Sequence, residues 1–170
     1  MIISLSINGV LRDVLSRFGE IYEKYQGKEV ISPVITPDLM QYVDFKNEDE
    51  LLEFLYNDAT MEIFGQAKEI EHNIISHLVD LYKEMPVGYK LKIVSDDLGK
   101  SKAATLWFLS KYGLVCDEII FYTSDTLDEL WGVTDIFITC YNQDMVCDLR
   151  LNTIKEIKSL ENVFEETITA

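Results

Sequence analysis

The sequence is poor in positive charge. Its 170 residues include 15 lysines and arginines against 30 aspartates and glutamates, which gives a net charge of −15. Nucleic-acid binding depends on cationic side chains that displace counterions from the phosphate backbone, so this balance argues against a general nucleic-acid binder. It also argues against tight binding of a polyanionic substrate unless a local site is positive. We therefore expect a solvated acidic surface and no nucleic-acid partner.

Long apolar runs and paired cysteines are missing as well. No apolar run approaches the ~20 residues that a bilayer-spanning helix needs. The first nine residues (MIISLSING) have no basic residue before their short apolar run, which is untypical of a signal peptide. Cys116, Cys140 and Cys147 are odd in number and lack C-x-x-C spacing, which favours reduced thiols over disulfides or a zinc site. We predict a cytoplasmic protein with no membrane partner.

The remaining composition is that of a folded domain. Apolar residues make up 48% of the chain and aromatic residues 11%, well above the range of disordered proteins. The length suffices for one domain with a substantial core and a small insertion.

The first half of the chain predicts one strand followed by helices. Residues 2–7 form a short apolar run that ends in a turn at Gly9, and a helical stripe then runs from Leu11 to Gly27, with Asp13 as a cap. Further helices are expected from Pro37, from Asn47 or Glu48, and over residues 66–84.

The second half alternates between strands and helices. Strands are expected over 90–94, 118–122 and 135–139, a helix over 101–112, and a last strand in 145–151 or 153–157. This pattern predicts an α/β fold: a Rossmann-like parallel sheet of about five strands, with helices on both faces. We divide the chain into a core of residues 1–16 and 86–170 and a helical cap insertion of residues 17–85.

Four sequence features accompany the predicted strands. They are Ser6-Ile-Asn-Gly-Val-Leu11, Lys92-Ile-Val-Ser95, the polar segment Thr123–Leu130, and Asp135-Ile-Phe-Ile-Thr-Cys140. In order and spacing they resemble the landmarks of the haloacid dehalogenase-like (HAD) superfamily of phosphotransferases. Within it, they are similar to the 5'(3')-deoxyribonucleotidase-like type with a helical cap. The resemblance covers most of the chain.

The resemblance implies that the first feature corresponds to the family motif D-x-D-G-[TV]-L. In that motif the first aspartate is the nucleophile and the second is the general acid/base. Here Gly9 is kept, but Ser6 and Asn8 stand at the two aspartate positions. An amide cannot exchange protons near neutral pH, and a serine hydroxyl is a weak nucleophile without a neighbouring base.

The other three features carry the remaining functional positions of the family. Ser95 matches the phosphate-binding serine or threonine, so Ser95 and the Gly9 turn are expected to be able to hold an anion. The family lysine falls in a segment without lysine, at Thr126. Thr139 and Cys140 replace the acidic pair that binds Mg²⁺, and neither supplies a carboxylate. We expect no Mg²⁺, no other cofactor and no metal site.

Two hypotheses follow. In the first, the chain is a degenerate, catalytically inactive HAD-like protein that acts as a structural or protein-interaction module, through a protein partner or self-association. Such small degenerate proteins also look like products of tailed-phage genomes, which adds a host cytoplasm or a virion to the expected locations. In the second, the remnant pocket serves a weak phosphatase or nucleotidase, or a nucleotide-phosphate sensor.

Several residues are candidates for catalysis or cation binding, although a structural role is the simpler interpretation of each. Ser6 is a candidate for a rerouted nucleophile, with Lys100, Lys102 or His72 as its base. Asp96 and Asp97 are candidates for cation binding, although a loop or capping role is the simpler interpretation. Cys140 is interpreted as inert rather than as a reactive thiol, because nothing basic flanks it.

Overall fold

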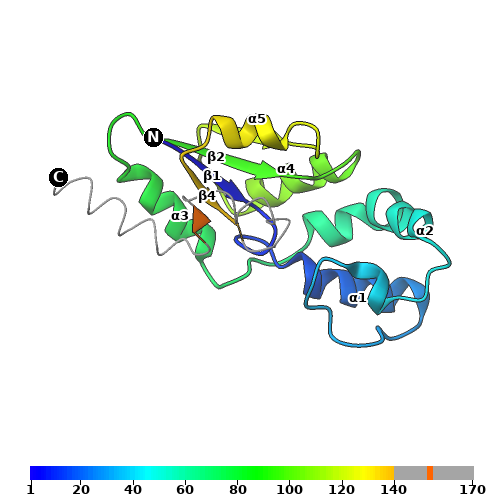
Figure 1. The fold of residues 1–170 in the computed structure, drawn as a ribbon. Coiled ribbons are helices and arrows are strands. Elements are labelled where there is room, and N and C mark those ends of the chain that lie inside the picture. Colours follow the sequence, from blue (N-terminus) through cyan, green and yellow to red (C-terminus); the bar gives the residue numbers. More distant parts are fainter. Residues whose placement is uncertain (140–152, 155–170) are drawn as a thin grey trace. The chain divides into compact units, whose positions relative to one another are not determined.

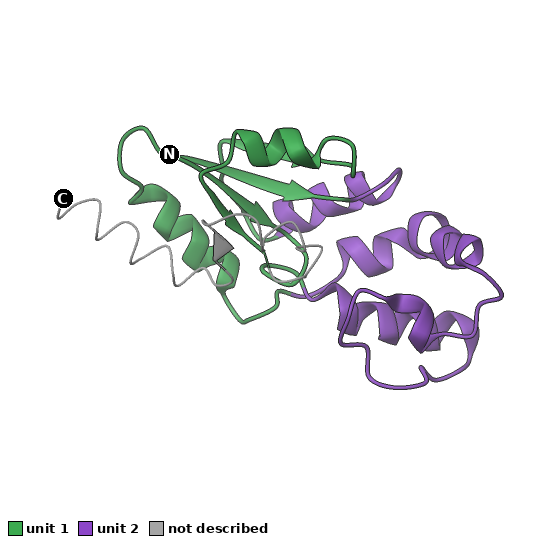
Figure 2. Cartoon of the chain, in the orientation of Figure 1, with its two compact units in different colours: residues 1–12, 69–96, 112–170 green, residues 13–68, 97–111 purple. Residues whose placement is uncertain are grey.

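The chain forms two compact units in its computed structural model, which describes residues 1–139 and 153–154 (Figure 1). Unit 1 contains residues 1–12, 69–96 and the described residues from 112 on, and unit 2 contains residues 13–68 and 97–111 (Figure 2). The chain therefore passes between the units four times.

Unit 1 is built on a parallel sheet. Its strands β1 (Ile2–Ser6), β2 (Lys90–Ser95), β3 (Glu118–Phe121) and β4 (Ile136–Ile138) lie in the order β3-β2-β1-β4. A two-residue strand, β5 (Thr153–Ile154), pairs in parallel with β4. The predicted α/β class with a parallel sheet is confirmed. A full-length fifth strand stays a prediction, because only these two residues of it are described.

Helices cover the sheet of unit 1. On one side α5 (Leu127–Gly132) packs through Trp131, whose ring stacks on Phe137 of β4 with centroids 4.7 Å apart. On the opposite side lies α3 (Ile74–Lys83), which buries Ile75, Leu78 and Leu81 (Figure 1). The sequence did not predict α5, because six residues are too few to show a helical period.

The predicted helix over residues 66–84 is wrong in its first half. Only Ile74–Lys83 is α-helical. The backbone N–H of Ile70 donates to the carbonyl of Leu11 at 2.8 Å, so it forms a long-range contact instead of a helical bond. Asn73 is left-handed, with φ 63°, and this conformation interrupts a helix.

Unit 2 is entirely helical in its regular structure. Its elements are α1 (Val14–Gln26), the 3₁₀ helix η1 (Leu39–Tyr42), α2 (Glu48–Glu53), the π-helical turns η2 (Phe54–Asp58) and η3 (Met61–Gly65), and α4 (Ser101–Lys111). An aromatic cluster joins α1, η2 and the segment before α2: Phe54 contacts the rings of Phe18, Tyr22, Tyr25 and Phe45 at centroid distances of 5.5 to 6.4 Å.

The predicted ends of α1 are confirmed. Asp13 Oδ1 accepts the backbone N–H of Ser16 at 3.2 Å, which caps the first turn. Gly27 ends the helix in the left-handed region, with φ 64°, where glycine has no steric cost.

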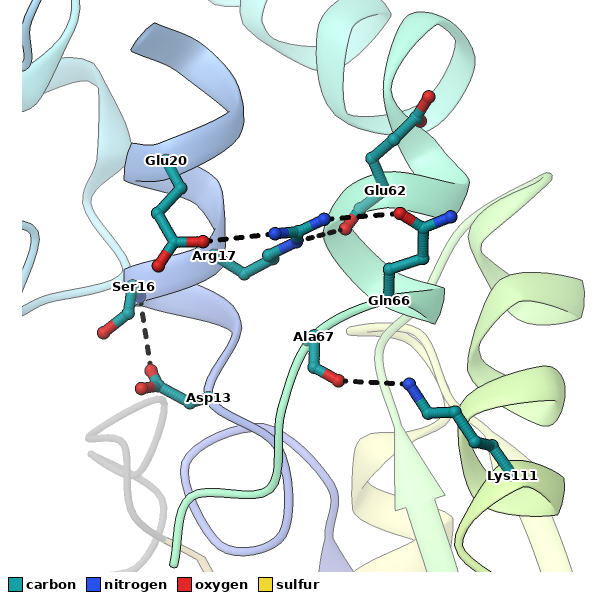
Figure 3. A network of polar contacts seen from close by, with 8 residues as sticks. All are labelled: Asp13, Ser16, Arg17, Glu20, Glu62, Gln66, Ala67 and Lys111. Atoms are coloured by element: carbon teal, nitrogen blue, oxygen red, sulfur yellow. Dashed lines mark hydrogen bonds and ion pairs between the residues drawn. The ribbon is translucent and has the colours of Figure 1, made fainter. Parts of the chain in front are cut away.

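Arg17 joins α1 to η3 (Figure 3). Its Nε donates to the Glu62 carbonyl at 2.8 Å and its Nη2 to Gln66 Oε1 at 3.3 Å. Its Nη1 forms an ion pair with Glu20 at 3.1 Å. Lys111 of α4 donates to the Ala67 carbonyl at 3.5 Å. Side-chain donors on α1 and α4 thus bond one carbonyl in the first turn of η3 and one just after it.

The grouping by contacts differs from the predicted core and cap in three segments. Residues 69–85 belong to unit 1, while residues 13–16 and 97–111 belong to unit 2. The functional division into core and cap stays a prediction. In the part of the chain that the structure describes, no helix combines the length and the apolar character needed to cross a membrane.

Candidate functional site

Three of the predicted site residues meet at the carboxyl edge of the sheet. Ser6 ends β1, Ser95 ends β2, and Thr139 directly follows β4. These strands are neighbours, because Ser6 pairs with Val94 and Leu5 with Ile138. After β1 the chain continues to β2 and β3 on one side of β1, and it then returns to β4 on the other side, so the strand order reverses at β1. In open α/β sheets, ligands bind outside the carboxyl ends of the strands at such a reversal point.

The polar side chains at this edge are largely withdrawn from solvent. Ser95 is 3% exposed and Thr139 is 7% exposed, while Ser6 is partly buried. The Ser95 carbonyl accepts the N–H of Tyr122 at 2.9 Å, which fixes the end of β2. Ser6, Ser95 and Thr139 therefore offer hydroxyl groups at this edge, and the carboxylate next to them in the sequence is that of Asp96, which directly follows Ser95 and is partly buried.

The loop after β1 is a closed turn made by its own backbone. The Ile7 carbonyl accepts the N–H groups of Leu11 and Arg12 at 2.9 and 3.0 Å, and the Gly9 N–H donates to the Arg12 carbonyl at 2.9 Å. Gly9 has φ 78°, a conformation that L side chains rarely adopt. The glycine of the predicted motif is thus required by the shape of the turn.

Arg12 lies at the centre of this turn. It is the largest of the fully buried side chains, with 0% exposure. Its Nε and Nη2 both donate to Asn8 Oδ1, at 3.0 and 2.7 Å. A buried guanidinium is costly unless its N–H groups are bonded, and Asn8 supplies an acceptor. The amide at the predicted acid/base position therefore has a structural role.

The sequence analysis missed Arg12. The available signal was its spacing of four residues from Asn8 across a glycine turn, in a chain with only 15 basic residues. No helical or strand period marks such a residue as buried, so its burial could not be inferred from the pattern.

The turn is also attached to the chain that enters α3. Arg12 forms an antiparallel bridge with Glu69. The Glu69 carboxylate in turn accepts the N–H groups of Asn73 and Ile75, at 3.3 and 3.0 Å. Backbone contacts therefore fix Arg12 both to its own turn, at Ile7 and Gly9, and to Glu69 before α3.

The remaining predicted positions do not join this group. Thr126 is exposed before α5, where its hydroxyl accepts the Thr123 N–H at 2.8 Å and stabilises a turn. It follows β3, which β2 separates from β1. Cys140 lies outside the described residues.

The residues considered as a base for Ser6 or as cation ligands lie in different parts of the structure. Lys100 and Lys102 belong to unit 2 with Asp97, which is buried and accepts the Thr105 hydroxyl at 2.7 Å. His72 is exposed, and Asp96 is partly buried after β2. Among residues 1–139 and 153–154, no three His, Cys, Asp or Glu side chains gather in a group that could hold a metal ion.

The chain matches no protein-family model and no curated protein sequence. The resemblance to the HAD superfamily accordingly stays a prediction. The chemistry of this site has to be judged from its own residues.

Proposed function

We propose that the chain is a catalytically inactive HAD-like protein that acts as a structural or protein-interaction module. The contact between Arg12 and Asn8 carries this proposal. A general acid/base must take up and release a proton. The Asn8 amide cannot do so, and its oxygen already accepts two N–H groups of a buried cation.

The residues at the positions of the family's aspartates do not fit the Mg²⁺ that the family resemblance implies. Magnesium prefers carboxylate oxygens, whereas Ser6, Asn8 and Thr139 supply two hydroxyls and an amide. The Asn8 oxygen also lies 2.7 Å from a guanidinium nitrogen, and this positive charge would repel a divalent cation. The proposed protein therefore retains the shape of the motif without its metal chemistry.

The same proposal includes the finer features of the fold. We include in it a HAD-like core with five strands. The strand order β3-β2-β1-β4-β5 supports this part of the proposal. The net charge of −15 disfavours nucleic acid and leaves a protein, or a second copy of this chain, as the partner. A cytoplasmic protein, or a phage protein within a virion, is compatible with this role.

A second candidate is a sensor that holds a phosphate group at the remnant pocket. The observation in its favour is the buried positive charge of Arg12 beside the Gly9 turn, with the Ser95 hydroxyl at the end of the adjacent strand. An anion at this edge would need such donors. Weak phosphatase or nucleotidase activity belongs to the same candidate.

A phosphatase assay tests the first candidate. The full chain is incubated with p-nitrophenyl phosphate and with deoxynucleoside monophosphates in Mg²⁺, beside Ser6→Ala and the double variant Ser6→Asp/Asn8→Asp. We expect no turnover above buffer for any of the three. Turnover by the unmodified chain that Ser6→Ala abolishes would overturn the proposal.

Thermal unfolding separates the two candidates. Inorganic phosphate or a deoxynucleoside monophosphate that binds the folded chain raises its melting temperature. We expect no shift at millimolar ligand. A shift that Ser95→Ala removes, while Ser124→Ala retains it, would favour the sensor.

A further inference from the structure

A pocket lies at the edge of the sheet opposite to Ser6, Ser95 and Thr139. It has a volume of about 390 Å³ and is lined by residues 82–83 and 85–89, together with Val115 and Asp117, all of unit 1. These residues end α3 or lead into β2 and β3, so the pocket lies at the amino ends of these strands. Small-molecule sites typically measure about 300 to 1,000 Å³, so the pocket is large enough for a metabolite.

Most of the pocket lining is apolar or aromatic. Met85, Pro86 and Tyr89 are partly buried. Two further lining residues are accessible to solvent, since Val87 is fully exposed and Val115 is 47% exposed. Exposed apolar side chains around a concave surface are typical of a ligand site. Tyrosine and methionine side chains also pack well against an apolar or aromatic group.

Asp117 gives the pocket a carboxylate that is held in place. Its Oδ1 accepts the Tyr82 hydroxyl at 3.1 Å, and its Oδ2 accepts the N–H of Leu91 at 2.8 Å. Its own N–H donates to the Leu91 carbonyl at 2.9 Å. A carboxylate has about four acceptor positions, so Asp117 retains acceptor capacity for a ligand. An ammonium group, which carries three donors, suits this acceptor.

Lys83 supplies the opposite charge in the lining. Its Nζ lies 3.8 Å from Asp80 Oδ1, and the two side chains are 69% and 70% exposed. An ion pair of this kind is weak, and the flexible lysine stem allows the ammonium to turn to another anion. The pocket therefore combines one carboxylate and one ammonium with an apolar wall. Such a lining fits a ligand that carries both charges and an apolar group.

We propose that this pocket binds a free amino acid with a large apolar side chain. The α-ammonium of the ligand would bond Asp117, its α-carboxylate would meet Lys83, and its side chain would pack on Tyr89 and Met85. A ligand with a positive charge alone leaves Lys83 unmatched, and one with a negative charge alone is repelled by Asp117. The pocket shares no residue with the HAD-like motif positions, so this inference goes beyond the proposed function and does not depend on it.

Nuclear magnetic resonance of the full chain tests the proposal, with phenylalanine as the probe. The reporters are the methyl groups of Met85 and Val115, which line the pocket, and of Val133, which is 51% exposed and lies outside the lining. We expect saturable shifts of the Met85 and Val115 signals at millimolar phenylalanine and no shift of Val133. An absent or non-saturable shift at the pocket, or an equal shift of Val133, would overturn the proposal.

Ligand analogues identify the chemistry that is recognised. Phenethylamine lacks the carboxylate, 3-phenylpropionate lacks the ammonium, and glycine lacks the apolar side chain. We expect phenethylamine to bind roughly threefold more weakly than phenylalanine, and the other two roughly tenfold or more. Binding of phenethylamine or 3-phenylpropionate as tight as that of phenylalanine would overturn the assignment to an amino acid. It would identify a site for an organic cation or for an apolar anion instead.

Variants of the two charged residues assign their roles. Asp117→Asn keeps an oxygen that can accept the Leu91 N–H and removes the charge, and we expect roughly tenfold weaker binding of phenylalanine. Lys83→Gln should weaken binding by roughly threefold. The matched controls are Glu84→Gln and Lys90→Gln, two exposed neighbours outside the lining, with an expected effect of less than about twofold.

Thermal unfolding shows whether each variant is folded. If Asp117→Asn does not fold, Lys83→Gln and the order of the analogues decide the assignment without it. Equal effects of a lining variant and its control would overturn the proposed contacts. The phosphatase assay above does not involve this pocket, so its outcome and that of the phenylalanine titration are independent.

Discussion

The guanidinium of Arg12 donates from both Nε and Nη2 to Asn8 Oδ1, at 3.0 and 2.7 Å. These two residues lie on either side of the Gly9 turn. Their contact ties the turn together and supplies the buried charge with a partner. It also explains how a motif that resembles a catalytic loop can keep its glycine while an amide stands at the position of an acid.

Arg12→Met should lower the free energy of unfolding by about 2–4 kcal/mol, because hydrogen bonds to a buried charged group are lost. The comparison is Arg17→Met, whose side chain is 24% exposed and whose loss should cost about half as much. Urea unfolding followed by circular dichroism measures both. The extrapolated free energy of unfolding carries an uncertainty of about 10–15%. A loss no larger than this uncertainty for Arg12→Met would contradict a structural role for the contact.

Tyr82 should make stability depend on pH in the alkaline range. Partial desolvation, the hydrogen bond from its hydroxyl to Asp117 Oδ1 at 3.1 Å and the charge of Asp117 raise the pKa of Tyr82 above 10.0. A raised pKa favours the protonated form in the folded state. Its stabilising contribution is therefore complete below the unfolded pKa and is lost as pH rises through the folded pKa.

The measurement compares urea midpoints of the unmodified chain and Tyr82→Phe from pH 8 to 11. We expect a constant advantage of the tyrosine up to about pH 10, followed by a decline. A difference that does not change up to pH 11 would contradict the assigned hydrogen bond.

Gly65→Ala should interact with Met61. The added methyl group would contact Met61 Sδ, so the gain of about 0.5–1 kcal/mol that a helical Gly→Ala change normally gives should be cancelled. In a Met61→Ala background part of the gain should return, as a coupling of about 0.5–1 kcal/mol in a double-mutant cycle, because the methyl group still lies 3.3 Å from Trp107 Cε3.

Gly19 provides the matched control for this cycle. A Cβ at Gly19 meets Val34 at 3.5 Å, an ordinary van der Waals distance, so Gly19→Ala should stabilise the chain with or without Met61. Additive changes at Gly65 and Met61 would show that the methyl group added at position 65 does not meet the Met61 side chain.

Asn47 should contribute to the stability of α2. Its Oδ1 accepts the Glu50 N–H at 3.0 Å, while the Glu50 carboxylate accepts the Lys46 N–H at 3.0 Å. Asn47→Ala should cost about 1 kcal/mol. Asp38→Ala serves as the control, because the side chain of Asp38 forms no capping hydrogen bond with η1, and it should change the melting temperature less. Equal shifts would argue against the cap.

The sequence predicted the regular elements with marked local signals. The strands β1 to β4 and the helices α1, α2 and α4 lie within about three residues of the expected ranges. These segments combine an apolar period with a clear stop such as Gly27 or Gly113, which has φ 70°. Local chemistry therefore sufficed to position them.

Features determined by long-range contacts were not predictable. Residues 66–73 have helix-forming composition, but the bond from Ile70 to Leu11 and the left-handed Asn73 prevent a helix there. The π-helical turns η2 and η3 bury Phe54, Leu55, Ile63 and Phe64 in the apolar core of unit 2, and no local sequence period distinguishes such turns from an α-helix. At the site, the positions of Ser6, Ser95 and Thr139 followed from the strand order, whereas the burial of Arg12 depends on tertiary structure.

The central place of β1 has a consequence for biosynthesis. Its neighbours are residues 90–94 and 136–138, so β1 leaves the ribosome well before either of its partner strands has been made. At about 5–20 residues per second, the apolar run of Ile2, Ile3 and Leu5 waits on the order of ten seconds for β2. β1 is thus exposed to water while the residues between it and β2 are made, and its other edge stays open until β4 follows.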